Sequence, residues 1–355
     1  MKLKKLAAFL LAAVIALGGC ANKLPDTAAT YNGGEVSGGM FVFQQLNAAN
    51  VAYGLLPNPY MQIDELLAQP IEGVTAEQWI NNYAVDLVKL NTAISIEAAR
   101  LGIELDPALI VEIDKQANET WQLEGEAMER MGVTVDDIKQ IAKNNLLSNE
   151  VFMAYFGENG TDPVSDEEIK KYFVENYRRS LMAVVSLVDP TTGMPLDEES
   201  EAAAKAAFAD YKSKIANGAQ IIDIIALEQQ RLNELSGVTD ANVELSEAET
   251  EVILGKEGSD YPAGLRDMLF DPNAKMNTPL FYEDEQFLIV FDIRDVLRNE
   301  ADLEGAKTAL LSIYKAKDFE DRLLAAADAA NFTVIPNLEK EFSVKSLLIK
   351  GSTQG

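Results

Sequence analysis

The side chains that most often carry catalysis are nearly missing from this chain of 355 residues, which has a single cysteine, Cys20, and no histidine. Ser-His-Asp and Cys-His catalysis both need an imidazole as general base, so both are excluded, and histidine-ligated zinc is excluded with them. A single cysteine also rules out an intramolecular disulfide. Carboxylates remain, but no pair suited to glycoside hydrolysis can be singled out among 57 acidic residues.

Cys20 follows a segment that is typical of a secretory signal peptide. Three lysines precede an apolar run over residues 6–17, and two glycines separate this run from the cysteine. The run is too short to span a bilayer comfortably as a permanent helix. The order Leu17-Gly18-Gly19-Cys20 resembles the bacterial lipobox, which implies cleavage between Gly19 and Cys20 and lipid on the cysteine.

The alternative for this region is an ordinary signal peptide, or an N-terminal anchor, with an incidental cysteine. Each buried methylene of an acyl chain contributes about 0.8 kcal/mol, so two or three chains hold a domain firmly at a membrane. We predict that residues 1–19 are a lipoprotein signal peptide and that residues 20–30 are a lipidated tether. The body of the protein is then extracytoplasmic and anchored to the bacterial cell membrane through Cys20.

The charge of the chain restricts its partners. The formal net charge is −27, and loss of residues 1–19 removes three lysines and no acid, which brings it to −30. Nucleic-acid binding needs a cationic surface, so we expect no nucleic-acid partner. We interpret acidic runs such as residues 197–199 as solvated surface, because no EF-hand loop accompanies them. No phosphate-binding glycine loop is present either, and we predict neither a cofactor nor a metal.

Helix start signals recur through the first 180 residues. Thr75 and Gln78 form a capping box, and apolar residues recur behind it at spacings of three and four until Gly102 ends the helix. Three further starts are Asp106-Pro107, Thr134 with Asp137, and Ser165 with Glu168. We therefore predict a helical lobe over residues 31–179, which opens with a turn, a short strand and a helix over about residues 39–53.

Beyond residue 179 the hydrophobic period changes from that of a helix to a mixture of strands and helices. The first predicted elements are a strand in LMAVVSLV (181–188), a helix over 198–217 and a short helix in AQIIDIIALEQQRL (219–232). A loop over 236–263 follows, then one helical turn in LRDMLF (265–270) and two strands in TPLFY (278–282) and QFLIVFDIRDV (286–296). The last elements are a long helix over 302–330 and a brief strand in FTVIP (332–336).

This order of elements predicts a mostly helical α+β fold. A discontinuous helical domain would be interrupted by a small α+β domain over residues 180–300. Residues 301–338 would then return to the N-terminal lobe as a helix and a strand. Residues 339–355 are interpreted as a frayed tail.

The same order resembles the extracytoplasmic foldases of the SurA/PrsA type, which contain a parvulin-like isomerase domain. The resemblance is carried by short segments spread over nearly the whole chain beyond the signal peptide. They are YNGGEVS (31–37) against "vNGe.vs", AARLGI (98–103) against "A...gi.vs", VSDEEIKKYFVEN (164–176) against "vsdeei..yf..n", and Met276, Pro279 and Leu280 against "lr.GemS.Pv.t..GyHii".

The resemblance implies a peptidyl-prolyl isomerase domain, but its catalytic histidines are missing. The first strand reads LMAVV (181–185), and the position in the final strand is Phe287. A parvulin lowers the barrier to cis–trans rotation of the peptide bond before proline, about 18–20 kcal/mol, without forming covalent bonds. Such an enzyme needs an apolar slot that holds the proline ring. Met268, Leu269, Phe270 and Phe287 are the candidates to line such a slot. The alternative is that these four residues are simply the core of the small domain.

We therefore predict a membrane-anchored foldase or chaperone that binds unfolded exported polypeptides, with an isomerase domain that is degenerate or weakly active. Whether the protein is an enzyme stays open at this point. The alternatives are an active peptidyl-prolyl isomerase and a cell-envelope scaffold or solute-binding lipoprotein. Solute binders usually show repeated β-α units, and this chain does not.

Overall fold

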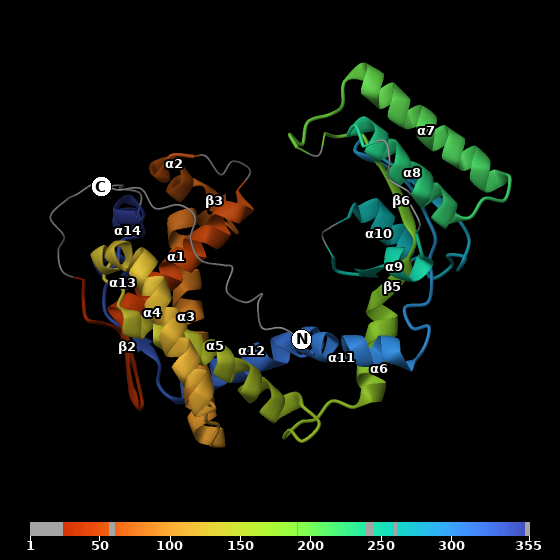
Figure 1. The fold of residues 1–355 in the computed structure, drawn as a ribbon. Coiled ribbons are helices and arrows are strands. Elements are labelled where there is room, and N and C mark those ends of the chain that lie inside the picture. The colour runs from red at the N-terminus through yellow and green to blue at the C-terminus, as the bar shows by residue number, and fades with distance from the viewer. Residues whose placement is uncertain (1–23, 57–60, 190, 239–244, 259–260, 352–355) are drawn as a thin grey trace. The chain divides into compact units, whose positions relative to one another are not determined.

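The computed structural model describes residues 24–56, 61–189, 191–238, 245–258 and 261–351, so Cys20 and the predicted signal peptide lie outside the described residues. The chain forms two compact units (Figure 1): unit 1 comprises residues 1–163 and 315–355, and unit 2 comprises residues 164–314. Unit 1 is mainly helical, whereas unit 2 combines antiparallel strands with helices. The predicted fold class, a mostly helical α+β chain in which a discontinuous helical domain contains an inserted α+β domain, is confirmed.

Unit 1 is built around long helices that pack on one another. Its helices are α1 (Gly38–Leu55), α2 (Ile63–Ala68), α3 (Ala76–Leu101), α4 (Pro107–Arg130), α5 (Val135–Phe156), α12 (Ala316–Ala329), α13 (Leu338–Glu341) and α14 (Val344–Gly351). Its strands are β1 (Thr27–Tyr31), β2 (Gly34–Ser37), β3 (Pro70–Ile71), β4 (Val74–Thr75) and β10 (Thr333–Val334). Helix α1 carries no charged residue and is buried over most of its length, which makes it the centre of this unit.

The helix starts predicted from the sequence are confirmed. Thr75 and Thr134 each form a capping box, and Gly102 ends α3 in the left-handed region with φ +67°. Asp137, the third residue of α5, also accepts a hydrogen bond from Ser37, the N-cap of α1. A Cβ atom at Gly39 would lie 2.1 Å from the Asp137 carboxylate, so this contact between two helix starts requires glycine.

Two predictions about the ends of unit 1 are wrong. Part of the predicted tether forms strand β1, which lies between β10 and β2 and buries Ala28 and Ala29. Most of the predicted frayed tail forms α13 and α14, and Phe342, which directly follows α13, and Val344, which begins α14, are fully buried. Both segments are ordered by contacts with residues far away in the sequence, and local patterns do not report such contacts.

Unit 2 consists of a set of antiparallel strands with helices on both sides. Its strands are β5 (Tyr177–Ser180), β6 (Met182–Ser186), β7 (Val252–Gly255), β8 (Leu280–Glu283) and β9 (Phe287–Phe291). Its helices are α6 (Asp166–Asn176), α7 (Glu198–Ala216), α8 (Ile221–Leu235), α9 (Glu247–Thr250), α10 (Ala263–Leu269) and α11 (Glu300–Tyr314). β5 pairs with β7, and β9 lies between β6 and β8.

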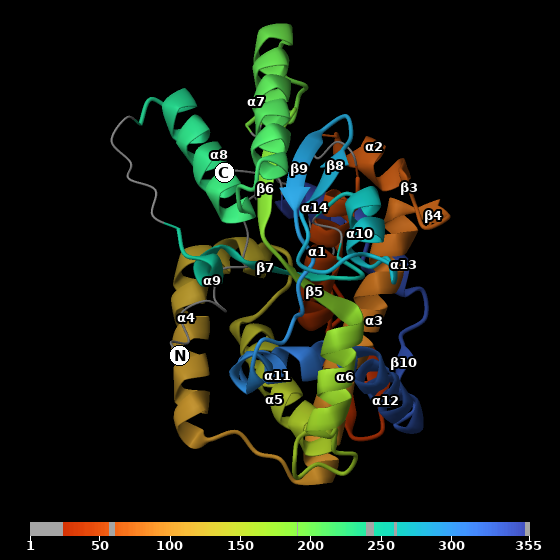
Figure 2. The same ribbon diagram turned by 90° about the vertical axis from the view of Figure 1, so that its right-hand side faces the viewer.

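Alternation along the strands divides unit 2 into two cores. The predicted first and last strands pair directly, with Met182 opposite Phe291 and Ser186 opposite Phe287. Ala183 and Val185 belong to the core under α7 and α8, whereas Met182 belongs to the core under α10. Figure 2 shows α7 and α8 on one side of these strands and α10 on the other.

The boundaries of unit 2 differ from the predicted domain limits at 180 and 300. The predicted helix over 302–330 is two helices, α11 and α12, interrupted at Lys315, and only α11 belongs to unit 2. Helix α6 joins unit 2 because it packs against α11, where the rings of Tyr172 and Tyr314 lie 4.8 Å apart. The prediction of a loop over 236–263 is wrong in part, because this segment contains α9 and β7.

Candidate functional site

A groove of about 530 Å³ opens on the side of the unit 2 sheet that carries α10, and we call it the unit 2 groove. Three strands and the start of one helix contribute to it. Its lining residues are Met182 and Val184 from β6, Val252 and Leu254 from β7, Gln286, Phe287 and Ile289 at β9, and Tyr261, Pro262 and Leu265 at α10.

The lining follows from the period of two along each strand. Val252 and Leu254 line the groove, whereas Ile253 between them does not, although it is 46% exposed. Val184 and Val252 are 41% and 40% exposed, which are high values for valine side chains. The groove therefore offers apolar surface to a ligand instead of burying it in the protein core.

The unit 2 groove contains almost no acid–base chemistry. Eight of its ten described lining residues are apolar, and the other two are Tyr261 and Gln286. The hydroxyl of Tyr261 already donates a hydrogen bond to the Gly255 carbonyl. Among the described lining residues, no side chain is therefore set to accept or release a proton near neutral pH.

Of the four residues predicted to line a proline slot, the structure places only Phe287 in the groove lining. Leu269 is fully buried, and Met268 and Phe270 are partly buried against the same core. The ring of Phe270 also lies 5.1 Å below the guanidinium carbon of Arg178. Met268 and Leu269 are the last residues of α10 and Phe270 is its C-cap, so the three consecutive side chains point in different directions.

The β7 wall of the groove was missed from the sequence because the segment was interpreted as a loop. Its signal is weak: VILG is four residues long and lies among acidic and glycine residues. β7 forms by pairing with β5, in which Tyr177 lies opposite Gly255 and Ser180 opposite Val252. Such a strand is defined by its partner and not by local propensity.

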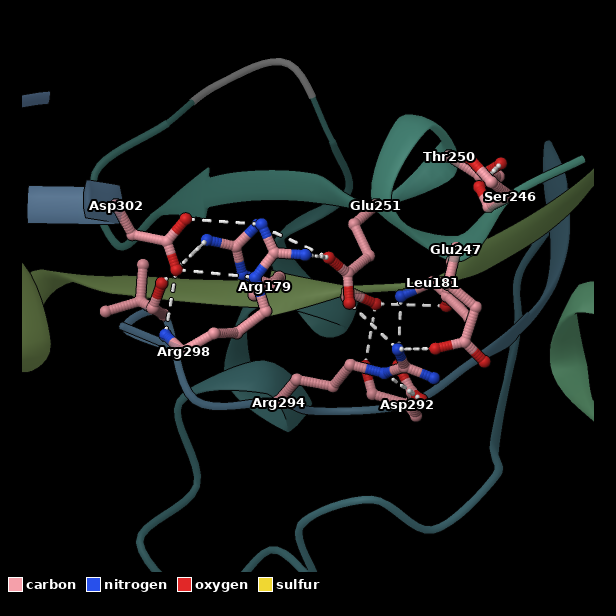
Figure 3. A network of polar contacts seen from close by, with 12 residues as sticks. Arg179, Leu181, Ser246, Glu247, Thr250, Glu251, Asp292, Arg294, Arg298 and Asp302 are labelled. Atoms are coloured by element: carbon pink, nitrogen blue, oxygen red, sulfur yellow. Dashed lines mark hydrogen bonds and ion pairs between the residues drawn. The ribbon is translucent and has the colours of Figure 1, made fainter. Parts of the chain in front are cut away.

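A network of arginines and carboxylates holds the start of this wall, as Figure 3 shows. We call it the arginine–carboxylate network. It consists of Arg179, Arg294 and Arg298 with Glu247, Glu251, Asp292 and Asp302. These residues come from β5, from α9 and the residue after it, from the segment that follows β9, and from α11.

Glu251 is the centre of the network and directly precedes Val252. Its carboxylate lies 3.3 Å from Nη1 of Arg179, 2.8 Å from Nη1 of Arg294 and 2.6 Å from Nη1 of Arg298. The side chains of Arg179 and Glu251 are only 6% and 4% exposed. Paired charges at this depth are stable only while all partners are present.

The remaining contacts join the network to the backbone. Arg179 donates to the carbonyl of Val296 at 2.8 Å, and its Nη2 lies 3.3 Å from Asp302. Asp292 accepts from the Leu181 amide at 2.9 Å and from Nε of Arg294 at 2.6 Å. The network thereby ties the wall of the groove to the strand next to it and to the start of α11.

The network also perturbs the titration of Asp302. Hydrogen bonds from the Arg298 side chain and backbone, with the charge of Arg179, lower the pKa of Asp302 from 3.8 to about 2. Because this pKa is lower in the folded state, the unfolded chain takes up the proton first as the pH falls. The stabilisation is therefore complete above the ordinary pKa and is lost as the pH falls towards the lowered one.

We predict that Asp302→Asn has a lower thermal unfolding midpoint than the parent protein at neutral pH. The difference between the two proteins should shrink as the pH falls from 3.8 to about 2, because Asp302 then becomes neutral in both states. Thermal unfolding of both proteins over this range measures the effect. A difference that is the same at every pH would contradict the assigned role of the Asp302 charge.

The fold and the groove together define an α+β insert with an apolar groove, carried within a helical unit. No protein-family model matches the sequence, and the search of curated proteins gives no match. No helix in the described ranges is long and apolar enough to cross a membrane.

Solved structures do match the chain. The foldase protein PrsA from Streptococcus pneumoniae matches with 16% identity and a TM-score of 0.34, over 78% of this chain and 98% of that one. PrsA from Lactococcus lactis matches with 14% identity and a TM-score of 0.36, over 92% and 99%. The peptidylprolyl isomerase PrsA from Bacillus anthracis matches with 11% identity and a TM-score of 0.27, over 70% and 100%.

Proposed function

We propose that this protein is an extracytoplasmic chaperone or foldase, anchored to the membrane through lipid on Cys20, which binds unfolded exported polypeptides. We further propose that unit 2 binds these polypeptides without catalysing proline isomerisation. One observation carries the proposal: the unit 2 groove is apolar, open to solvent and free of acid–base groups among its described lining residues.

The apolar lining supports binding of unfolded chains. Folded proteins bury most large apolar side chains, so an exposed apolar groove selects chains that have not yet folded. Each Å² of apolar surface that a client covers contributes about 25 cal/mol. A groove of about 530 Å³ has room for several apolar side chains and is not restricted to a single proline ring.

The same lining argues against catalysis of isomerisation. The amide must be twisted over a barrier of about 18–20 kcal/mol, and polar groups that favour the twisted form lower it. The parvulin resemblance implies histidines at this place, whereas the chain presents Met182, Val184 and Phe287. The one hydroxyl among the described lining residues, that of Tyr261, donates to the backbone of Gly255.

The position of β1 in the sequence supports the proposed anchor. Only six residues separate Cys20 from β1, which starts at Thr27, so a lipid on Cys20 would keep unit 1 close to the membrane surface. Confinement near the membrane raises the effective concentration of chains that emerge there. The net charge of −30 expected after cleavage would keep the protein soluble and away from anionic lipid.

A pair of neighbouring substitutions tests the unit 2 groove. Val252→Asp places a charge in the lining, whereas Ile253→Asp places the same charge on the same strand outside the lining, at similar exposure. We expect about ten times more of the Val252→Asp protein to be needed to suppress the aggregation of a reduced, unfolded client. The reason is that a bound client would have to desolvate the carboxylate. Ile253→Asp should behave like the parent protein.

Two measurements complete this test. Light scattering of the aggregating client gives the chaperone activity, and a protease-coupled assay on a proline peptide gives the isomerase activity. The proposal requires suppression of aggregation together with isomerisation at the uncatalysed rate. Isomerisation well above that rate would establish the alternative, an active isomerase. Equal effects of the two substitutions would show that the groove does not bind the client.

A further inference from the structure

Unit 1 contains a second groove, of about 770 Å³, between helices α1, α3, α4 and α5, and we call it the unit 1 groove. The four helices are labelled in Figure 1. Its apolar lining consists of Phe43, Leu87, Leu90, Ile94, Ile113, Ala117, Leu123, Ile138, Ile141 and Ala142. Leu123 is 86% exposed, so part of this apolar surface is open to solvent.

The polar part of the lining is dominated by carboxamides, which distinguishes it from the unit 2 groove. They are Gln44, Asn47, Asn91, Gln116 and Asn145. A carboxamide offers a donor and an acceptor, as a peptide group does, so it can bind the main chain of any sequence. The unit 1 groove thus combines apolar surface for side chains with peptide-like groups for a backbone.

Two of these carboxamides have hydrogen-bonding capacity left over. Oε1 of Gln44 accepts from Asn47 at 3.0 Å, and Oδ1 of Asn91 accepts from Asn144 at 2.6 Å. Neither the Gln44 nor the Asn91 amide nitrogen donates to another described residue, although each residue is only 6% exposed. Neither nitrogen is among the buried, unpaired side-chain atoms of the described residues, so each one reaches solvent and can donate to a ligand in the groove.

Among the described lining residues, one is charged: Glu119. Its side chain is exposed and forms no ion pair among the described residues. Helix α4, which carries it, has six acidic and two basic residues. A ligand with a positive charge would therefore be attracted to the α4 side of the groove, and an acidic segment would be repelled.

We propose that the unit 1 groove binds an extended polypeptide segment that carries apolar side chains next to a lysine or arginine. The carboxamides of Gln44 and Asn91 donate to its backbone carbonyls, and Glu119 pairs with its cation. This inference rests on the proposed function and specifies the client: the two grooves are separate sites, and only the unit 1 groove selects by charge.

A matched pair of substitutions on α4 tests the site. Leu123 lines the groove, whereas Val111 lies on the same helix outside the lining and is 69% exposed. The probe is a short fluorescein-labelled peptide of leucine, phenylalanine and alanine with one lysine. By fluorescence anisotropy, we expect Leu123→Asp to weaken its binding by about tenfold or more and Val111→Asp to leave it unchanged.

Two further probes test the recognition itself. The same peptide with glutamate in place of lysine should bind the parent protein more weakly, and Glu119→Gln should reduce that preference by a factor of about two to five. A backbone in which ester linkages replace the central amides, and thereby weaken the carbonyl acceptors, should also bind more weakly. Equal binding of the lysine and glutamate peptides to the parent protein would overturn the charge selection.

The outcomes separate this inference from the proposed function. If Leu123→Asp and Val111→Asp bind the peptide equally while Val252→Asp loses suppression of aggregation, the unit 1 site is overturned and the proposed function stands. If the parent protein neither binds the peptide nor suppresses aggregation, both fall. Loss of peptide binding in Leu123→Asp, with folding unchanged by circular dichroism, supports the site.

Discussion

Arg179→Met is expected to lower the free energy of unfolding of unit 2 by about 3–5 kcal/mol. The substitution removes one cation from a buried cluster and leaves the carboxylates of Glu251 and Asp302 with fewer partners. It also removes the hydrogen bond to the Val296 carbonyl. The loss should be larger than the value of any one contact, because a buried carboxylate without its partner keeps its cost of desolvation.

Hydrogen exchange is the suitable measurement, because both tryptophans of the chain, Trp79 and Trp121, belong to unit 1 and report little on unit 2. The amides of β5 and β7 should exchange faster in Arg179→Met, whereas those of α3 should not change. Lys205→Met is the control within unit 2, since the pair that Lys205 forms with Glu201 is exposed and should contribute under about 1 kcal/mol. Unchanged protection of β7 in Arg179→Met would show that the network does not hold this strand.

The network also explains how the wall of the unit 2 groove is positioned. Glu251 precedes Val252, so the contacts that fix Glu251 also fix the first groove residue of β7. Arg179→Met should therefore weaken client binding as well as stability. Arg179→Lys should give an intermediate result, because lysine keeps the charge but lacks the planar fork that reaches two carboxylates.

Local signals in the sequence are sufficient for much of the fold. The capping boxes at Thr75, Thr134 and Ser165 each use residues three positions apart, so a short segment contains the complete signal. The hairpin of β8 and β9 is equally local, with Glu283 opposite Leu288. Such elements are confirmed because the interactions that define them lie within a few residues.

The parts that were missed depend on distant partners. β7 pairs with β5 across about 75 residues of sequence, and the network that holds it is assembled from four segments. Of the four residues predicted for a proline slot, only Phe287 lines the groove, because α10 supplies Leu265 to it and another wall comes from β7. Without β7, no pattern in the sequence indicates which face of α10 meets the groove.

The end of the chain gives the second large effect, in unit 1. Phe342→Ala is expected to lower the free energy of unfolding of unit 1 by about 3–5 kcal/mol, the usual cost of such a cavity. The ring of Phe342 is 1% exposed and meets the ring of Phe41 edge-on at 5.2 Å. Its carbonyl accepts from the side chain of Gln45 at 2.8 Å, which ties the last helices to the centre of α1.

Tryptophan fluorescence during urea unfolding measures this effect directly, because both tryptophans lie in unit 1. Lys345→Ala is the control from the same segment: its pair with Asp64 is exposed, and the change should be under about 1 kcal/mol. If Phe342→Ala lowers the free energy of unfolding by less than about 1 kcal/mol, the end of the chain is frayed, as expected from the sequence. A loss of the expected size would make residues 338–351 part of the folded body, because the Phe342 ring packs against Phe41 of α1.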